Sequence, residues 1–266
     1  MTPDDVARAA RMLDDAEIRR EQIRPLTLDF PDMGMDQAYA VQAAWIERKL
    51  ARGASVTGYK IGLTSRTMQR TMNIDTPDSG VLLDDMAFAN GADIRAADFL
   101  DPRIEAEFAF VLAAPLAGSH VGIDDVLAAT AYVVPALELI SARSTRTDPA
   151  TGYTRKVFDT IADNAANAGY IPGEVRIDPG AIDLRWQGAL LAKDGVIEDT
   201  GLGAAVLDHP ARGICWLCER LAAYGQGLDA GQFVLSGSFT GAVPVTAGTR
   251  IRADYGDFGT IDVGFV

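Results

Sequence analysis

The sequence predicts an α+β protein in which a helical N-terminal segment precedes mixed β-sheets rolled into a sandwich or barrel. Up to residue 55, apolar side chains recur with the spacing that is typical of helices. Beyond residue 55, short strand-like runs dominate, and Gly or Pro turns separate many of them. These runs do not alternate regularly with helices, so a doubly wound parallel sheet is not expected. We therefore expect a helical segment at 1–55 and a β-rich domain at 56–266.

The first helix is expected to begin at Pro3. Thr2 is a candidate N-cap, and proline suits the first helical position because it has no amide hydrogen to satisfy. Two acidic residues, Asp4 and Asp5, then lie in the first turn, where their negative charge interacts favourably with the positive end of the helix dipole. The apolar spacing continues at Val6, Ala9, Leu13 and Ala16, and a second helix is predicted in which Tyr39, Ala43, Ile46 and Leu50 share a face.

Seven strand-like runs follow, at 56–62, 105–113, 132–140, 182–192, 232–236, 249–254 and 260–266. The stretch AKDGV (192–196) is a good hairpin signal, because Asp-Gly suits a tight turn with positive φ angles. Two helices are predicted to interrupt the strands, one near 123–131 and one from Pro210 to about Tyr224. We find no internal repeat in the sequence.

Charge and composition exclude several classes of protein. With 266 residues, 48% of them hydrophobic, the chain can bury a large core. Its 24 basic and 37 acidic residues give a net charge of −13, which argues against binding to nucleic acid and requires a local reversal of the field for any anionic substrate. The acidic N-terminus lacks the apolar region of a signal peptide, and no apolar run of 18 residues occurs. We expect a cytoplasmic protein with no membrane partner.

Two cysteines, Cys215 and Cys218, lie in GICWLCERL. Their spacing fits a redox pair, but it also fits two buried thiols on one helix. The neighbouring Ile214, Leu217 and Leu221 continue an amphipathic stripe and favour the second interpretation.

The stretch DPRIEAEFAFVL (101–112) holds two glutamates in a segment that otherwise has the pattern of a strand. Residues i and i+2 of a strand point the same way, so Glu105 and Glu107 share a face. Glu138 lies in a second apolar run, YVVPALELI. Three carboxylates without paired histidines form the oxygen-ligand set that Mg²⁺ or Mn²⁺ prefers. The alternative is that the pair lies on the solvent face of an edge strand and that Glu138 is only ion-paired.

Four segments of the sequence have motifs of one known family. They are GYKIGLTSRTMQRTMNIDTPDSGVLLDDM (58–86), PRIEAEFAFVL (102–112), YVVPALELISAR (132–143) and KVFDTIADNAANAG (156–169). Together they closely resemble the hydratase/decarboxylase family of meta-cleavage pathways. This family belongs to the fumarylacetoacetate hydrolase-like superfamily, whose fold we therefore expect. The segment SARSTRTDPATGYTRKVFDT looks like that of members which hydrate 2-oxohept-4-ene-1,7-dioate in homoprotocatechuate breakdown.

The resemblance implies a set of site residues. The metal ligands of the family correspond to Glu105, Glu107 and Glu138, its lysine to Lys60, and the acidic residue of its PDxG motif to Asp78. In this motif Ser79 stands where the family commonly has an aromatic residue.

A 2-oxo acid can chelate a hard cation, which stabilises negative charge on the 2-oxo oxygen while water adds to the conjugated alkene. We expect Lys60 to bind the substrate carboxylate and to manage the enol proton, with a pKa lowered by desolvation beside the metal. Asp78 is expected to position water or to act as the base.

A dicarboxylate substrate needs a second cation for its distal carboxylate. Four basic residues gather in one segment: Arg143, Arg146, Arg155 and Lys156. A guanidinium grips a carboxylate in two places, and Arg143 is the best single candidate, although a solvated loop would explain each of these residues too. The stretch SGSFTG (236–241) offers hydroxyls, among them that of Ser238, and amides freed by its glycines for anion contacts, but a hairpin turn explains it equally well.

Two other functions stay open. The same metal site supports decarboxylation of a 2-oxo dicarboxylate, and spacing alone does not separate it from hydration. A catalytically silent partner subunit is a third possibility, against which the retained glutamates and Lys60 argue. The resemblance also implies a homo-oligomer that acts on a small 2-oxo dicarboxylate and associates with a decarboxylase of the same pathway.

Overall fold

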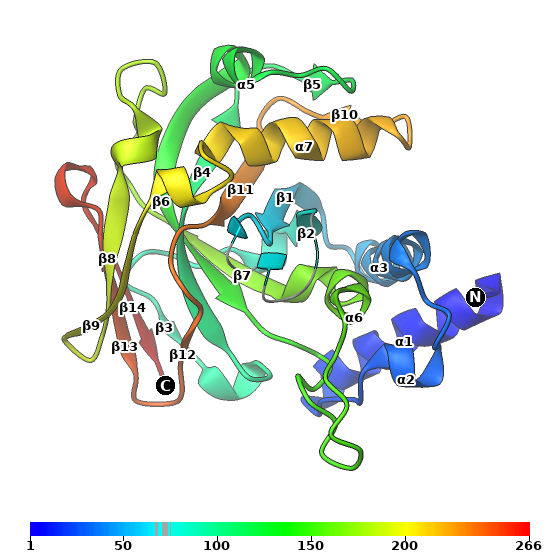
Figure 1. Ribbon diagram of the computed structural model, residues 1–266. Helices are drawn as coiled ribbons and strands as arrows, with labels where there is room; N and C mark the ends of the chain where they lie inside the picture. Colours follow the sequence, from blue (N-terminus) through cyan, green and yellow to red (C-terminus); the bar gives the residue numbers. More distant parts are fainter. Residues whose placement is uncertain (67–68, 71–73, 75) are drawn as a thin grey trace.

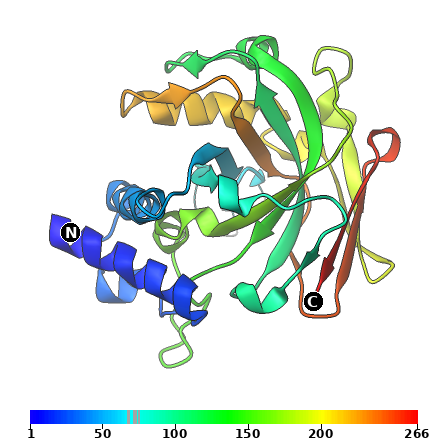
Figure 2. The same cartoon turned by 180° about the vertical axis from the view of Figure 1, so that it is seen from behind.

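A large curled β-sheet forms the centre of the molecule (Figures 1 and 2). The N-terminal helices pack on one face of it, and a second sheet and the helix Pro210–Ala222 pack on the other. The structure is a computed structural model that describes residues 1–66, 69–70, 74 and 76–266. The α+β class and the helical N-terminal segment expected from the sequence are confirmed. In the described residues, no helix has the length and apolar character needed to cross a membrane.

The large sheet has seven strands and includes both glutamate-bearing segments. Its order is β2 (Asp78–Leu83), β1 (Val56–Gly62), β11 (Phe233–Ser238), β4 (Arg103–Leu112), β6 (Thr130–Ile140) and β7 (Asn167–Pro172), with β12 (Val243–Pro244) also paired to β4. Strands β1 and β11 run parallel, and the other neighbours run antiparallel. The sequence predicted β1 with its observed bounds and missed β2 and β7.

The second sheet lies at the C-terminal end of the chain, on the left in Figure 1. Its order is β3 (Asp93–Ile94), β14 (Thr260–Phe265), β13 (Arg250–Asp254), β8 (Gly188–Lys193) and β9 (Val196–Leu202), and β5 (Leu116–Ala117) pairs separately with β10 (Gly227–Leu228). The predicted hairpin is confirmed: Lys193 pairs with Val196 across Asp194 and Gly195, whose φ angles are 52° and 83°. The strand predicted at 182–192 begins later, because Leu184–Trp186 forms a 3-10 turn.

The N-terminal helices are α1 (Pro3–Arg19), α2 (Leu26–Asp29) and α3 (Met35–Leu50). The predicted N-cap is confirmed, since the Thr2 side chain accepts from the Asp5 amide. The second predicted helix is confirmed as α3. Of the residues expected to share one face, Ile46 is buried whereas Ala43 and Leu50 are exposed, and the buried face also holds Val41 and Trp45. Further helices within the described residues are α5 (Ile123–Ala129), α6 (Val157–Ala162) and α7 (Pro210–Ala222), of which α6 was not predicted.

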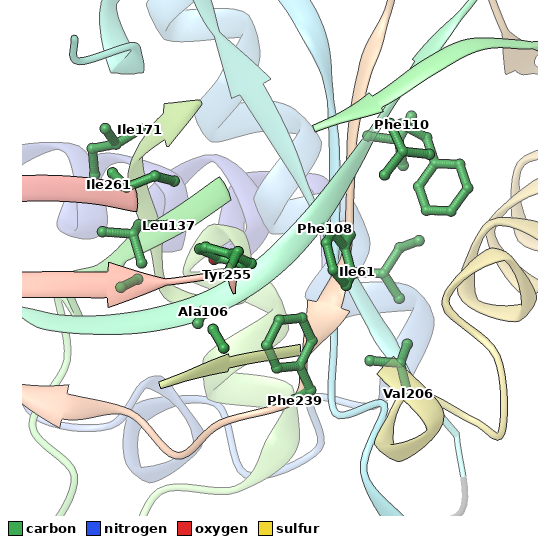
Figure 3. Close-up of a cluster of buried hydrophobic side chains, with 14 of the residues drawn as sticks. Ile61, Ala106, Phe108, Phe110, Leu137, Ile171, Val206, Phe239, Tyr255 and Ile261 are labelled. Carbon is green, nitrogen blue, oxygen red and sulfur yellow. The ribbon is translucent and has the colours of Figure 1, made fainter. Parts of the chain in front are cut away.

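Two apolar cores pack on opposite faces of the large sheet. Alternate residues of β4, including Ala106 and Phe108, belong to the core shared with the second sheet and α7 (Figure 3). Ala109 on the opposite face of β4 belongs to the core shared with α1, α3 and α6. The N-terminal helices therefore pack on the sheet through a common core, and the division into 1–55 and 56–266 as separate domains stays a prediction. Helix α7 carries both cysteines as free thiols, as predicted, but only Cys218 is buried and Cys215 is half-buried.

Candidate metal centre

Three carboxylates meet on the helix-facing side of the large sheet. Glu105 and Glu107 point the same way from β4, as expected for residues i and i+2, and Glu138 of β6 is the direct cross-strand partner of Glu105. One carboxylate oxygen from each lies within 4.8 Å of the others. We call these three residues the carboxylate cluster. The alternative of a solvent-facing edge strand is wrong, because β4 lies inside the sheet and Glu107 and Glu138 are each only 1% exposed.

Burial and mutual repulsion destabilise the charged forms of these carboxylates. Burial raises the pKa of Glu105 to about 8, and the charge of Glu138 adds to this effect. Burial and the neighbouring carboxylates raise the pKa of Glu107 well above its ordinary value. A hydrogen bond from the Gly237 amide lowers this pKa by less than they raise it. Without a compensating cation, the cluster is therefore electrostatically strained.

The donors that surround the cluster leave part of it unsatisfied. The Gly237 amide donates to Glu107 Oε2 at 2.9 Å, and Asn167 Nδ2 donates to Glu138 Oε1 at 2.8 Å. Among the described residues, none donates to Glu107 Oε1, which is buried. A buried carboxylate oxygen without a donor is costly. Three carboxylates as oxygen ligands, one of them with an oxygen that accepts no hydrogen bond, fit a divalent cation of the Mg²⁺ or Mn²⁺ type.

Lys60 lies against the cluster from β1. It is 3% exposed, and its Nζ is 3.4 Å from Glu138 Oε1. Burial lowers the pKa of Lys60, but the surrounding carboxylates, chiefly Glu138 and Asp78, raise it by more. The pKa of Lys60 is therefore above its ordinary value. This direction holds for the protein without a metal ion, whereas the lowered pKa was expected for Lys60 beside a bound metal and stays a prediction.

Asp78 begins β2 and is the cross-strand neighbour of Gly62. It is 1% exposed, and its Oδ1 has no donor among the described residues. Burial raises the pKa of Asp78 to about 6, although Lys60 acts in the opposite direction. Gly62 is needed for this approach, because a Cβ at that position would lie 2.2 Å from Asp78 Oδ1 and 3.0 Å from Lys60 Nζ. The structure therefore brings Asp78 and Lys60 together beside the cluster.

Ser79, the departure from the family motif, is buried next to α3. Its amide and its hydroxyl lie 3.2 and 3.4 Å from the hydroxyl of Tyr39. An aromatic side chain from α3 therefore covers the position at which the family commonly has its own aromatic residue.

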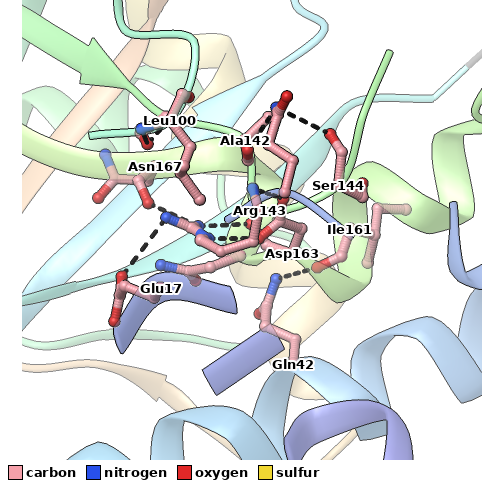
Figure 4. A network of polar contacts seen from close by, with 12 residues as sticks. Glu17, Gln42, Leu100, Ala142, Arg143, Ser144, Ile161, Asp163 and Asn167 are labelled. Atoms are coloured by element: carbon pink, nitrogen blue, oxygen red, sulfur yellow. Dashed lines mark hydrogen bonds and ion pairs between the residues drawn. The ribbon is translucent and has the colours of Figure 1, made fainter. Parts of the chain in front are cut away.

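Arg143 does not lie where the sequence analysis expected it. Its guanidinium is 1% exposed, pairs with Asp163 at 2.5 Å and donates at 2.9 Å to the backbone carbonyls of Asp163 and Asn167 (Figure 4). It also packs over the ring of Trp45, 4.9 Å from the centroid. This placement argues against the assignment of Arg143 to a distal carboxylate, because Nε and Nη2 donate within the protein and Nη1 faces Glu17 at 3.7 Å. Sequence spacing did not reveal the partner, which lies 20 residues further along the chain.

Ser238 is the last residue of β11. Its hydroxyl donates to the carbonyl of Thr240 at 2.7 Å and thereby closes a turn, so its proton is used within the protein and a contact with substrate stays a prediction. The useful group of this segment is the neighbouring Gly237 amide, which binds Glu107. Gly237 has a φ of 114°, and a Cβ there would lie 2.3 Å from the Thr64 hydroxyl, so only glycine fits.

Asn167 lies at the site, in the stretch DNAANAG, whose asparagines the sequence suggests either as turn residues that satisfy backbone groups or as pocket residues. It directly follows Asn164, Ala165 and Ala166, whose φ angles of 52°, 50° and 59° are unusual for residues other than glycine. The Asn164 side chain holds this turn by accepting from the Val81 amide at 2.7 Å and donating to the Val81 carbonyl at 2.9 Å. The strained turn thus places Asn167 against Glu138, and strain of this kind is typical of functional sites. The repeated asparagines of DNAANAG were the available signal.

Comparisons with known proteins agree with this architecture. The chain is 53% identical over 257 residues to the 2-oxo-hept-4-ene-1,7-dioate hydratase of Escherichia coli, a match that covers 97% of this chain and 96% of the relative. It is 37% identical over 269 residues to the 4-oxalocrotonate decarboxylase of Pseudomonas sp. strain CF600, covering 100% and 98% of the two chains. No protein-family model matches the sequence.

Solved structures share the fold. The 4-oxalocrotonate decarboxylase from Pseudomonas putida G7, complexed with magnesium and adipate, superposes with a TM-score of 0.94 at 34% identity and covers 100% of this chain and 99% of its own. The fumarylpyruvate hydrolase from Pseudomonas aeruginosa has a TM-score of 0.60 at 14% identity, covers 78% of this chain and 88% of its own, and shows the shared fold alone.

Proposed function

Because the chain belongs to the hydratase/decarboxylase family of meta-cleavage pathways, within the fumarylacetoacetate hydrolase-like superfamily, we propose that it is a metal-dependent hydratase of 2-oxo-alkenoates. The proposed substrate is 2-oxohept-4-ene-1,7-dioate, in the aromatic catabolism of homoprotocatechuate. The observation that carries this proposal is the buried carboxylate cluster beside Lys60 and Asp78, in a chain 53% identical to a hydratase with that substrate in its name.

Glu105, Glu107 and Glu138 would hold a divalent cation, for which we propose Mg²⁺ or Mn²⁺. Such an ion supplies a Lewis acid that stabilises negative charge on the 2-oxo oxygen of a chelating substrate. A relative that is 34% identical is described in complex with magnesium. Asn167 and the Gly237 amide keep the ligand carboxylates oriented, as outer hydrogen bonds commonly do around a metal.

Lys60 is assigned to the substrate carboxylate next to the 2-oxo group. Its ammonium is buried 3.4 Å from Glu138 and offers hydrogen-bond donors at the side of the cluster. An ammonium fixed there binds the anionic end of the substrate within an otherwise acidic site and places the alkene relative to Asp78.

Asp78 is assigned to the water. Its Oδ1 is buried, without a donor among the described residues, and close to Lys60. A carboxylate with a free acceptor can orient a water molecule and take a proton from it as the oxygen attacks the electrophilic alkene carbon. The proton that the neighbouring carbon gains passes through the same pair of side chains.

Decarboxylation is the second candidate, since the 37% identity to a 4-oxalocrotonate decarboxylase spans the whole chain. The two reactions differ in their products. The test is to add 2-oxohept-4-ene-1,7-dioate with Mg²⁺ or with EDTA, and to follow the ultraviolet absorbance and the released CO₂. A metal-dependent loss of absorbance without CO₂ supports the hydratase. Release of CO₂ overturns it in favour of the decarboxylase, and no metal-dependent change in either indicates a silent partner subunit.

We also propose that the chain works as a homo-oligomer and associates with a decarboxylase of the same pathway, which would supply its 2-oxo acid directly. Sedimentation of the chain alone and with that enzyme tests both statements. A monomer that does not co-sediment with the decarboxylase would contradict them.

A further inference from the structure

Arg143 is paired with Asp163, so the group that binds the distal carboxylate of a dicarboxylate substrate has still to be identified. A dicarboxylate entering a protein with a net charge of −13 needs a group of cations close to the cluster. Three arginines supply one, and we call Arg103, Arg146 and Arg155 the arginine group.

Arg103 and Arg146 gather around a single carboxylate. Arg146 Nε is 2.7 Å from Asp101 Oδ2, and Arg103 reaches the same oxygen at 3.4 Å. Arg103 precedes Glu105 by two residues on β4, so it lies on the cluster side of the sheet, roughly 7 Å along the strand. Its buried Nε has no acceptor among the described residues. One carboxylate therefore does not neutralise this end of the site.

Arg155 is bound to Arg146 through the backbone. The Arg155 amide donates to the Arg146 carbonyl at 3.0 Å, next to the antiparallel bridge between Thr147 and Thr154. Arg146 and Arg155 are thus directly opposite each other, and opposite residues of an antiparallel pair project to the same face. Two guanidiniums on one face repel each other unless an anion lies between them.

Arg155 is the least satisfied of these cations. It is 9% exposed, and its guanidinium donates to the Ser144 carbonyl at 3.3 Å without an ion pair among the described residues. Asp163, the carboxylate that acts on it most strongly, is already paired with Arg143. Charged side chains are almost never buried unless they are paired, so an anion that is not part of the described chain is expected here.

Contacts place the arginine group at one end of the cluster. Arg103 is two residues from Glu105 on the same strand, and Arg146 shares the Asp101 carboxylate with Arg103. Arg155 lies directly opposite Arg146 and so belongs to the same end of the site.

We propose that Arg155, assisted by Arg146, binds the distal carboxylate of a dicarboxylate substrate and sets the preference of the site for dicarboxylates over monocarboxylates. This inference rests on the proposed function for the identity of the reaction. A planar guanidinium held in one orientation binds a carboxylate with two parallel hydrogen bonds, whereas a methyl group in the same place leaves the guanidinium without an acceptor.

The experiment compares Arg155→Met with the unmodified enzyme, both loaded with Mg²⁺. The kcat/KM for 2-oxohept-4-ene-1,7-dioate should fall by about 30-fold or more, the usual effect of removing one partner of a buried charge pair. The kcat/KM for 2-oxopent-4-enoate, which lacks the distal carboxylate, should change less than about 3-fold. Arg146→Met should show a smaller loss in the same direction. Equal losses for both substrates, or none for either, would overturn the proposal.

A binding measurement separates this inference from the proposed function. Calorimetry with adipate and with hexanoate should show a selective loss of adipate affinity in Arg155→Met. If the unmodified protein hydrates neither substrate yet binds adipate through Arg155, the proposed function fails and the inference stands. Equal loss of adipate and hexanoate affinity overturns the inference.

Two further variants keep the test decisive. Arg155→Lys preserves the charge, should fold even if Arg155→Met does not, and should retain part of the preference. Arg24→Met removes an ion pair with Asp148 at 3.3 Å and so loosens the same segment without touching the arginine group. It should leave the ratio of the two kcat/KM values unchanged, and an equal shift in this control would overturn the role of Arg155.

Discussion

Asn167 and Glu138 are joined by a 2.8 Å hydrogen bond from an amide nitrogen to the carboxylate oxygen that also faces Lys60. The amide belongs to a residue held by a strained turn, and the carboxylate belongs to the cluster. The backbone carbonyl of Asn167 in turn accepts from Arg143, so the turn is fixed from behind. This relationship connects the polar network in Figure 4 with the candidate metal centre.

The first prediction concerns Asn167→Ala. Glu138 loses the donor that orients it, and the affinity for Mg²⁺ should fall about 10- to 100-fold, as for other outer hydrogen bonds around metals. Titration calorimetry of the metal-free protein measures this effect. Asn90→Ala is the control, because Asn90 bonds only to backbone groups of the second sheet. Unchanged Mg²⁺ affinity in Asn167→Ala would remove Asn167 from the site.

The second prediction separates two effects of placing a side chain at Gly237: the strain of its positive φ angle and the collision of a Cβ with Thr64. Gly237→Ala adds a Cβ 2.3 Å from the Thr64 hydroxyl at a φ of 114°, whereas Gly231→Ala adds one in open space at a φ of 85°. Gly231→Ala should cost about 1 kcal/mol of unfolding free energy from the φ angle alone. Gly237→Ala should cost more and should also weaken Mg²⁺ binding, because the amide that holds Glu107 is displaced. Urea unfolding checks the first part, and equal costs for the two variants would refute the collision.

The third prediction tests the structural role of Arg143. Arg143→Met leaves Asp163 buried without its cation and should lower the free energy of unfolding by about 3–5 kcal/mol. The remaining folded enzyme should keep its ratio of dicarboxylate to monocarboxylate kcat/KM. Arg185→Met, which removes an exposed ion pair with Asp183, should change stability little. A stable Arg143→Met variant with a lost preference for dicarboxylates would reinstate Arg143 as the distal contact.

The fourth prediction concerns pH and the N-terminal helices. Asp14 of α1 is fully buried and accepts from Arg48 of α3 at 2.9 Å and from Arg52, in the turn that follows α3, at 2.7 Å. Burial raises the pKa of Asp14, but the two arginines lower it by more. The pKa of Asp14 is therefore below its ordinary value. A lowered pKa means that this stability is present above the unfolded-state value and is lost as the pH falls through the folded-state value.

Asp14→Asn should therefore destabilise the protein by about 1–3 kcal/mol at neutral pH, and the difference should vanish in acid. Urea unfolding between neutral and acidic pH measures the effect. Asp15→Asn, whose side chain is half exposed, is the matched control. A difference that persists unchanged in acid would show that the charge of Asp14 is not its cause.

Much of the site could be predicted from local patterns. The i, i+2 rule placed Glu105 and Glu107 on one face, and the apolar surroundings of Glu138 indicated a buried carboxylate. Both are properties of a single strand. Long-range choices could not be predicted in the same way. The sequence showed several arginines in one segment, but the choice between Arg143 and Arg155 depends on where Asp163 lies after folding.

The missed elements have physical reasons too. Strand β7 (Asn167–Pro172) follows a run of asparagine and alanine whose φ angles are positive, and no strand pattern precedes it. In α3 both faces carry apolar residues, so spacing alone did not show that Trp45 is buried and Ala43 exposed. The structure resolves this because Trp45 packs beneath the guanidinium of Arg143.

The most direct test of the account is the titration of the metal-free protein with MgCl₂, compared between the unmodified chain and Glu107→Gln. Glu107 contributes one of the three buried carboxylates and has an oxygen without a donor among the described residues. We predict that the unmodified chain binds Mg²⁺ at one site and that Glu107→Gln, still folded by circular dichroism, binds it more than about 100-fold more weakly, beyond the loss from an outer hydrogen bond. Equal Mg²⁺ affinity in the two proteins, or no binding by the folded unmodified chain, would contradict the account.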